Sequence, residues 1–170
     1  MSASGVDLTP LDADALIAET VEATGLDDFG EPFWREGLER LLDSQRRESR
    51  LHEIGVFVAA DDARMNLTNR LEVTDWHKRH PDMAERDVTP PIVVVGQGRT
   101  GTTILLDLLA QDPAHRVPLT WEVDQPCPPP ETSTYDTDPR IAISQAKGDA
   151  SELLIPGFQA IHPMGALLAQ

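Results

Sequence analysis

The sequence predicts an α/β fold, in which a helical N-terminal region (residues 1–89) precedes the start of a domain built on a parallel sheet (residues 90–170). Two observations lead to this prediction. In the first half, apolar residues recur three and four positions apart, which is the period of a helix. The second half opens with four consecutive aliphatic residues, Ile92 to Val95, before a glycine-rich stretch and another helical pattern. A short, uniformly apolar run is typical of a strand buried on both faces.

Start and stop signals define the expected helices of the first half. Thr9, followed by a proline, is a typical helix start, and Gly25 is a typical stop. A second helix is expected from about Pro32. In residues 48–73 the apolar residues mostly recur at helical spacing, although a glycine and a pair of aspartates would permit a break in the helix. The pattern of residues 74–80 predicts one more short helix.

The second half contains one clear strand pattern, whereas a parallel sheet needs several strands with covering helices. Residues 116–122 are a candidate second strand, which Pro118 would restrict to an edge. A weak helical pattern covers residues 139–147, and residues 164–170 resemble the opening of a helix without a stop signal. We therefore expect an incomplete domain, the chain being the N-terminal portion of a longer protein.

Composition restricts the possible partners and location. The 170 residues include 14 Lys+Arg and 29 Asp+Glu, which gives a formal net charge of −15. Such an acidic chain repels phosphate backbones, so we expect no nucleic-acid partner. The single cysteine, Cys127, excludes an internal disulfide and fits a reducing compartment. No apolar run approaches the roughly 20 residues of a membrane span, and no signal peptide is recognisable, so we expect a cytoplasmic protein without a transmembrane segment.

The glycine-rich stretch between the expected strand and helix is the most informative part of the chain. It consists of Gly96, Gln97, Gly98, Arg99, Thr100, Gly101, Thr102 and Thr103. Glycines at such a junction let the backbone turn sharply and direct free N–H groups at an anion, and the first helical turn adds its positive dipole end. A phosphate or sulfate group is therefore the expected ligand. The plainer alternative is a glycine turn that binds nothing.

One interpretation of this stretch is a nucleotide P-loop, as in kinases. Gly96 and Gly101 have the required spacing, and Thr103 fits the last position of the motif. Thr102, however, stands where the motif has its phosphate-binding lysine. Ordinary hydrolysis of ATP or GTP is poorly supported without that lysine.

A second interpretation is the dinucleotide-binding fingerprint of Rossmann oxidoreductases. The three glycines match its spacing, and Glu122 follows Gly101 at about the distance of a ribose-binding acid. Two residues argue against it. Leu105 occupies a position where a small residue usually permits close packing, and Pro118 interrupts the strand that would present the acid.

A third interpretation takes the run from Arg99 to Thr103 as the working unit. Residues 91–113, PIVVVGQGRTGTTILLDLLAQDP, resemble the Arg-bearing branch of the sulfotransferases that use 3′-phosphoadenylyl sulfate (PAPS). This branch includes bacterial enzymes and is similar to tyrosylprotein and heparan sulfotransferases. Residues 118–130 and 161–170 also resemble the bacterial members, so the resemblance covers roughly residues 90–170. One departure is the pair Gln97-Gly98, where many members have an apolar residue and proline.

The resemblance implies a P-loop-NTPase-like parallel sheet and transfer of a sulfonyl group from PAPS to a hydroxyl or amine acceptor, leaving 3′,5′-ADP. No metal is required. Arg99 would clamp the 5′-phosphate and offset the charge that develops on the leaving oxygen. The N–H groups of Thr100 to Thr103, with the hydroxyls of Thr102 and Thr103, would bind the same phosphate. The acceptor is expected to be a small-molecule or lipid-like alcohol.

An acceptor hydroxyl also needs a base. In the tyrosylprotein branch a glutamate beyond the loop helix serves, and Glu122 lies in the matching region, displaced by about two residues. Glu122 is therefore the expected catalytic base, with a solvated acid at a strand end as the plainer alternative. His162 is the alternative base, because other sulfotransferases use histidine. A truncated P-loop protein that binds an anion or a partner without catalysis is a further alternative.

Overall fold

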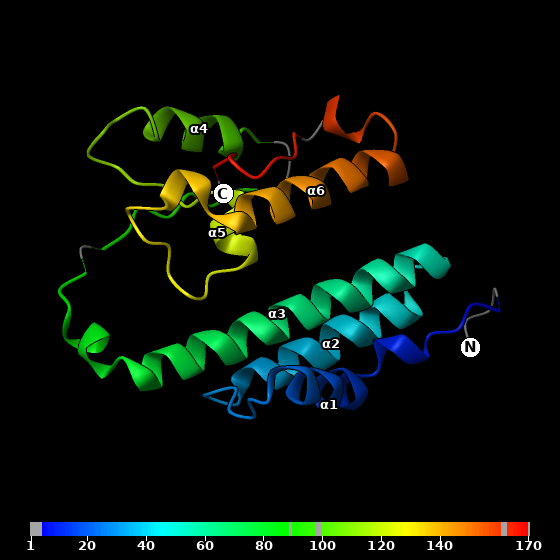
Figure 1. Cartoon of the computed structure of the whole chain (residues 1–170). Helices are drawn as coiled ribbons and strands as arrows, with labels where there is room; N and C mark the ends of the chain where they lie inside the picture. The colour runs from blue at the N-terminus through cyan, green and yellow to red at the C-terminus, as the bar shows by residue number, and fades with distance from the viewer. Residues whose placement is uncertain (1–4, 89, 98–99, 161–162, 170) are drawn as a thin grey trace. The chain divides into compact units, whose positions relative to one another are not determined.

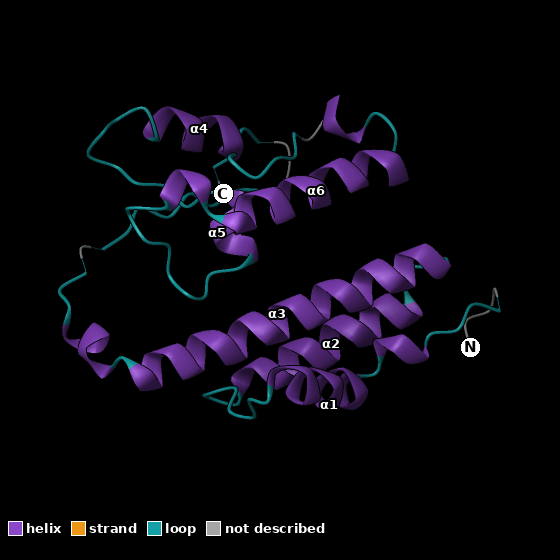
Figure 2. Cartoon of the chain, in the orientation of Figure 1, coloured by secondary structure: helices purple, strands orange, loops and turns teal. Residues whose placement is uncertain are grey.

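The structure is a computed structural model, and it describes residues 5–88, 90–97, 100–160 and 163–169. It divides into two compact units, Met1–Glu85 and Arg86–Gln170 (Figure 1). Within the described ranges all regular elements are helices (Figure 2).

In the described part of the first unit there are three long helices and two short 3₁₀ turns. In chain order they are η1 (Thr9–Leu11), α1 (Ala13–Thr24), α2 (Phe33–Arg47), α3 (Glu53–Arg79) and η2 (Pro81–Glu85). Their inward faces, together with Phe29 from the segment between α1 and α2, form one apolar core. Its buried members are Leu11, Leu16, Phe29, Leu42, Val56, Ala60, Ala63, Leu67 and Leu71.

Local signals set the ends of α1 and α2. Asp12 caps α1 by accepting a hydrogen bond from the Ala15 N–H at 3.0 Å, so the cap lies three residues beyond the expected Thr9. Gly25 ends α1 in the left-handed conformation, at φ 69°, which confirms the expected stop. Helix α2 begins directly after Pro32, also as expected.

Helix α3 is one continuous element of 27 residues, so the prediction of a separate short helix over residues 74–80 is wrong. Val56, Ala60, Ala63, Leu67 and Leu71 recur at helical spacing and all lie in the core. Packing of this one face favours an unbroken helix over the local breaks that the sequence permits.

The second unit is built from shorter helices. They are α4 (Thr102–Leu109), α5 (Thr120–Asp124), η3 (Tyr135–Thr137), α6 (Pro139–Leu154) and η4 (Phe158–Ala160). Helix α6 extends seven residues beyond the expected end at residue 147.

The predicted parallel sheet is absent from the described part of the chain, and the α/β fold class is wrong for this structure. The expected strand at Ile92 to Val95 has no hydrogen-bonded neighbour among the described residues, and Val93 and Val95 are 73% and 87% exposed. Residues 116–122 do not form a strand either, because Thr120 begins α5. A run of aliphatic residues reports only low polarity, whereas a strand is stabilised by hydrogen bonds to a neighbouring strand.

The segment 163–169 and α5 hold the second unit together. Thr120 N–H donates to the Leu168 carbonyl at 2.9 Å, and Trp121 N–H donates to the Ala166 carbonyl at 3.2 Å. An isolated antiparallel bridge joins Leu119 to Ala169. Trp121 and Ala166 are fully buried at this junction, which fixes the start of α5.

Candidate functional site

The glycine-rich loop folds tightly against the first turn of α4. A Cβ atom built on Gly96 would lie 2.7 Å from Thr102 Cγ2 and 2.8 Å from Thr100 Oγ1, closer than real Cβ atoms approach their neighbours. The Thr100 hydroxyl donates to the Gln97 carbonyl at 2.6 Å, which closes the turn. Only glycine fits at position 96 while the two threonines keep these positions.

The beginning of α4 is open to a ligand. Gly101 occupies its N-cap position in the left-handed conformation, with φ 91°, and no side chain among the described residues caps the helix. No atom of the described residues lies within 4 Å of the place where a Cβ of Gly101 would stand. Backbone N–H groups of the first turn therefore lack the side-chain acceptor that usually satisfies them, and the helix dipole favours an anion at this end.

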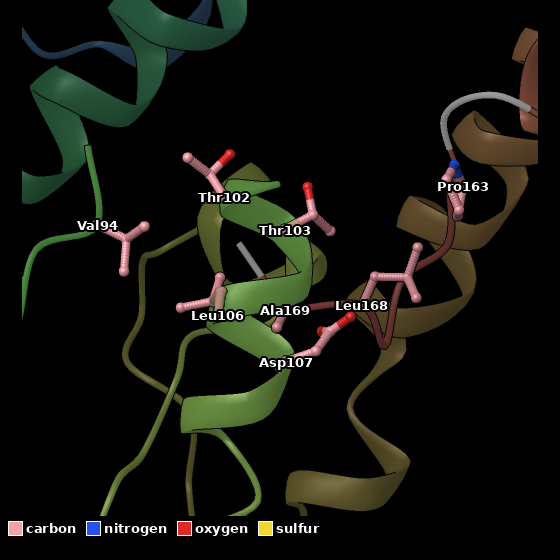
Figure 3. A pocket seen from close by; sticks show the side chains of 8 residues that line it. All are labelled: Val94, Thr102, Thr103, Leu106, Asp107, Pro163, Leu168 and Ala169. Carbon is pink, nitrogen blue, oxygen red and sulfur yellow. The ribbon is translucent and has the colours of Figure 1, made fainter. Parts of the chain in front are cut away.

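A cavity of about 280 Å³ lies beside this junction (Figure 3). Thr102 and Thr103 contribute hydroxyl groups to its wall, and Asp107 contributes a carboxylate one turn further along α4. The remaining lining residues are Val94, Leu106, Pro163, Leu168 and Ala169. The cavity is therefore mainly apolar with a hydroxyl-bearing rim.

Three of the predicted site residues lie outside the described part of the chain: Gly98, Arg99 and the alternative base His162. The structure does bring together the other members of the predicted loop. Gly96 and Gln97 precede the turn, Thr100 closes it, and Gly101, Thr102 and Thr103 begin α4.

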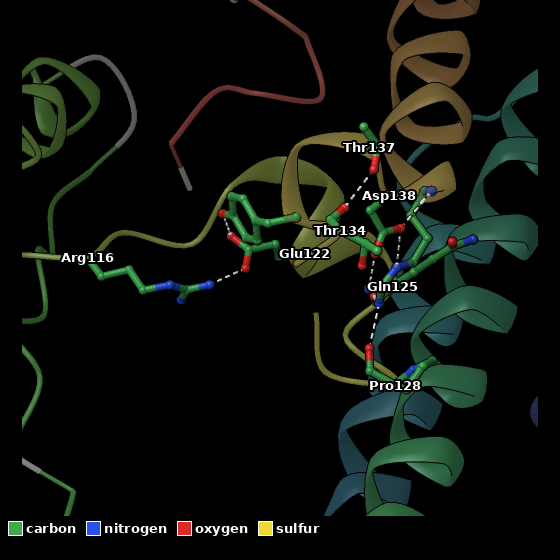
Figure 4. Close-up of polar contacts among 9 residues, drawn as sticks. Arg116, Glu122, Gln125, Pro128, Thr134, Thr137 and Asp138 are labelled. Carbon is green, nitrogen blue, oxygen red and sulfur yellow. Dashed lines mark hydrogen bonds and ion pairs between the residues drawn. The ribbon is translucent and has the colours of Figure 1, made fainter. Parts of the chain in front are cut away.

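Glu122 lies away from a strand end, in the first turn of α5, and its side chain is buried (Figure 4). Its carboxylate accepts three hydrogen bonds. Oε1 accepts from the Arg116 guanidinium, and Oε2 accepts from the Leu119 N–H at 2.8 Å and from the Tyr135 hydroxyl at 2.9 Å. The plainer alternative of a solvated acid is therefore wrong, because this carboxylate is buried and accepts three hydrogen bonds. These contacts also differ from those of an acid at the end of a Rossmann strand.

Beside this carboxylate, Arg140 ties the following loop to the start of α6. Its guanidinium contacts both oxygens of Asp138 and donates to the carbonyls of Gln125 and Pro128, each at 2.7 Å (Figure 4). It also lies over the Trp121 ring, 4.9 Å from the centroid. The guanidinium lowers the pKa of Asp138 to about 2, because it stabilises the ionised carboxylate.

Sequence reasoning missed Arg116 and Tyr135 as partners of Glu122. Tyr135 is the only tyrosine of the chain, but it lies 13 residues beyond Glu122 and outside the motifs that the sequence contains. Burial, and secondarily the hydrogen bond to Glu122, raise the pKa of Tyr135. The phenol therefore remains a hydrogen-bond donor at neutral pH.

Neither a metal centre nor a membrane span is recognisable in the described ranges. No group of three or more His, Cys, Asp or Glu side chains is arranged there to hold a metal ion. None of the described helices combines the length and apolar character that crossing a membrane requires.

Comparison with solved structures finds two similar proteins. They are sulfotransferase STF1 from Mycobacterium tuberculosis H37Rv and sulfotransferase STF9 from Mycobacterium avium, each with 32% sequence identity and a TM-score of 0.76. The match covers 94% of this chain but only 44% of STF1 and 41% of STF9. The chain thus spans less than half the length of either. Comparison with curated proteins gives no significant match.

The family comparison agrees with the resemblance noted in the sequence. The model of the sulfotransferase family matches residues 90–168, which include the glycine-rich loop, α4, Glu122 and Tyr135. Together with the two mycobacterial structures, this match shows that residues 90–168 are similar to the sulfotransferase family.

Proposed function

We propose that the chain forms the donor-binding part of a PAPS-dependent sulfotransferase, with the loop 96–103 holding the 5′-phosphate of PAPS. The observation that carries this proposal is the junction between the loop and α4. There Gly96 leaves no space for a side chain, and the first turn of α4 has no side-chain cap among the described residues. Such a junction fits a phosphate group, and it lies within the segment that matches the family.

Each residue of the loop would make a different contact with the 5′-phosphate of PAPS. Thr100 would contribute its backbone N–H, because its hydroxyl already donates to Gln97. Thr102 and Thr103 would contribute N–H groups and the hydroxyls at the rim of the cavity. Arg99, which the sequence places in the same loop, would add a forked positive charge. When bound, PAPS supplies an activated sulfonyl group for an acceptor oxygen or nitrogen.

Glu122 is our candidate for the base that accepts the proton of the acceptor. A carboxylate offers about four lone-pair positions, and the three hydrogen bonds of Glu122 leave one of them, on Oε1. Burial and an arginine partner keep this group in one orientation, as proton transfer requires. The expected acceptor is a small-molecule or lipid-like alcohol, and the cytoplasmic location stays a prediction from the sequence.

The absence of a lysine at position 102 favours this function over a nucleotide kinase. In a P-loop that position holds the lysine that contacts the β- and γ-phosphates, and here it is Thr102. Transfer from PAPS involves no γ-phosphate, so neither this lysine nor bound Mg²⁺ is needed.

Isothermal titration calorimetry with 3′,5′-ADP tests the proposal. We expect binding to the wild-type protein and binding weaker by about 10- to 100-fold in Arg99→Ala, because a charge-assisted contact is lost. The matched control is Arg46→Ala, which removes an exposed arginine from α2 and should leave binding unchanged. Tighter binding of ATP with Mg²⁺ than of 3′,5′-ADP would contradict the proposal and favour a kinase.

A further inference from the structure

We propose that Tyr135 and Arg116 are positioning residues that hold the Glu122 carboxylate so that Oε1 alone can receive the acceptor's proton. This inference rests on the proposed function, in which Glu122 is the base. It adds two residues that neither the loop motif nor the sequence pattern indicated, and it assigns them a role that can be measured separately from sulfonyl transfer.

The backbone fixes the position of the Glu122 carboxylate. Glu122 is only 8% exposed and is the third residue of α5, from where its side chain reaches back to the Leu119 N–H. This backbone contact holds Oε2 at 2.8 Å from the nitrogen. The start of α5 is itself held by the hydrogen bonds of Thr120 and Trp121 to the segment 163–169. The backbone that carries Glu122 is therefore anchored before any side chain acts on it.

The side-chain contact to Oε2 of Glu122 comes from Tyr135. The Tyr135 hydroxyl donates to this oxygen at 2.9 Å from the 3₁₀ turn η3. The ring of Tyr135 packs edge-on against the buried ring of Trp121, with centroids 5.3 Å apart and an interplanar angle of 60°. Because the ring is held by packing, the hydroxyl has a defined position. With Leu119 and Tyr135 both donating, Oε2 has no lone pair left for a substrate.

The contact to Oε1 of Glu122 comes from Arg116. The Arg116 guanidinium donates to this oxygen and occupies one of its two lone-pair positions. The Arg116 side chain is 65% exposed, whereas that of Glu122 is 7% exposed, so Arg116 is the partner of this ion pair that faces solvent. The remaining lone pair of Oε1 is the one free acceptor position among the described contacts.

The charges around Glu122 support this arrangement. Arg116 faces it directly, and Arg140, paired with Asp138, adds a second positive charge nearby. Tyr135 faces it as a neutral donor, because burial and the neighbouring carboxylate raise the pKa of the phenol. An ionised phenolate would repel the carboxylate, and the raised pKa moves that ionisation further above neutral pH.

Tyr135 can be titrated directly because it is the only tyrosine among the 170 residues. Phenolate absorbance near 295 nm reports its ionisation, with far-UV circular dichroism on the same samples to verify the fold. The hydrogen bonds around Glu122 predict that two substitutions shift the pKa of Tyr135 in opposite directions. Glu122→Gln should lower the pKa of Tyr135, because Glu122 raises it through a hydrogen bond and its charge, and Arg116→Gln should raise it, because Arg116 lowers it. Unchanged titration in both variants would overturn the inference.

Kinetics then test the role in catalysis. With PAPS as donor and 2-naphthol as probe acceptor, we expect Tyr135→Phe to lower kcat about 10-fold with an unchanged KM for PAPS, because one hydrogen bond to the charged carboxylate is lost. Arg116→Gln should lower kcat similarly, and Arg116→Lys should restore part of it. Thr137→Val is the matched control, since it removes a hydroxyl from the same turn that contacts Thr134 and not Glu122. A normal kcat in Tyr135→Phe would overturn the positioning role.

The two measurements separate this inference from the proposed function. If the wild-type protein is active but neither variant shifts the titration of Tyr135, only the inference is overturned. If both variants shift the titration of Tyr135 but the wild-type protein does not bind 3′,5′-ADP, the proposed function is overturned, and with it the catalytic role of Tyr135 and Arg116. Shifts in both variants together with the kcat losses support both conclusions.

Discussion

At the scale of single residues, Trp121 organises the second unit through contacts on several sides. The ring is fully buried, Tyr135 packs against it edge-on, and the Arg140 guanidinium lies over its face. The neighbouring residue Glu122 then takes its hydrogen bonds from the same surroundings. One aromatic side chain thus brings the candidate base and the Asp138–Arg140 pair together, although the chain separates them by up to 18 residues.

The Asp138–Arg140 pair gives the protein a defined acid sensitivity. The pKa of Asp138 lies at about 2 in the folded state, against 3.8 for a free aspartate. A lowered folded-state pKa stabilises the fold above the unfolded value, and this stability is lost as the pH falls from about 4 towards 2. We expect Asp138→Asn to reduce this acid-dependent loss, measured as urea midpoints from tryptophan fluorescence between pH 7 and pH 2.

The control for this prediction is Asp136→Asn, which changes an exposed carboxylate in the same stretch of chain. It should keep the acid dependence of the wild-type protein. An Asp138→Asn variant whose midpoint falls as steeply as that of the wild type would show that the pair does not govern acid stability.

At the scale of elements, the junction between the loop and α4 depends on the missing side chain of Gly96. We expect Gly96→Ala to displace the first turn of α4, because the new Cβ would stand 2.7 Å from Thr102 Cγ2. Overpacking of this kind costs about 1–3 kcal/mol, and 3′,5′-ADP should bind about 10-fold more weakly once the N–H groups are displaced. Thermal denaturation and calorimetry measure the two effects.

Gly37→Ala is the matched control at this scale. Gly37 lies inside α2, and nothing is within 4 Å of the position that its Cβ would occupy. This substitution should stabilise the protein by about 0.5–1 kcal/mol, because alanine loses less conformational freedom than glycine in a helix. If Gly96→Ala behaved like Gly37→Ala, the tight packing of the loop would have no role in binding.

At the scale of the whole molecule, the chain consists of two units with different kinds of interior. The described residues of the first unit include nine buried core residues, all between Leu11 and Leu71. Buried apolar residues of the second unit, within its described ranges, are Trp121 and Ala166. Apolar burial therefore stabilises the first unit, whereas the second depends more on hydrogen bonds and ion pairs around Trp121.

This difference predicts that a chain of residues 1–85 folds alone. The buried core residues described for this unit all lie within residues 1–85, so it should unfold cooperatively, with the helical circular dichroism signal expected for η1 to η2. Urea denaturation followed by circular dichroism measures this. A gradual, non-cooperative loss of signal would mean that the core needs residues beyond Glu85.

The sequence by itself determined where helices begin or end at local signals and which motif the glycine-rich loop contains. Gly25 ends α1 and Pro32 precedes α2 because a left-handed glycine and a helix-initiating proline act locally. The motif around residues 96–103 indicated the sulfotransferase family, which the comparisons support, since a phosphate-binding loop needs particular residues at fixed spacing. The roles of Arg99 and Glu122 remain predictions.

Only the tertiary structure decided which segments have partners. Residues 92–95 have the composition of a buried strand, yet a strand needs a hydrogen-bonded neighbour, and the described chain provides none. The continuity of α3 follows from the core that its apolar face packs against. The contacts of Glu122 with Arg116 and Tyr135 join residues 6 and 13 positions away, and no local pattern encodes contacts that arise when Trp121 is buried.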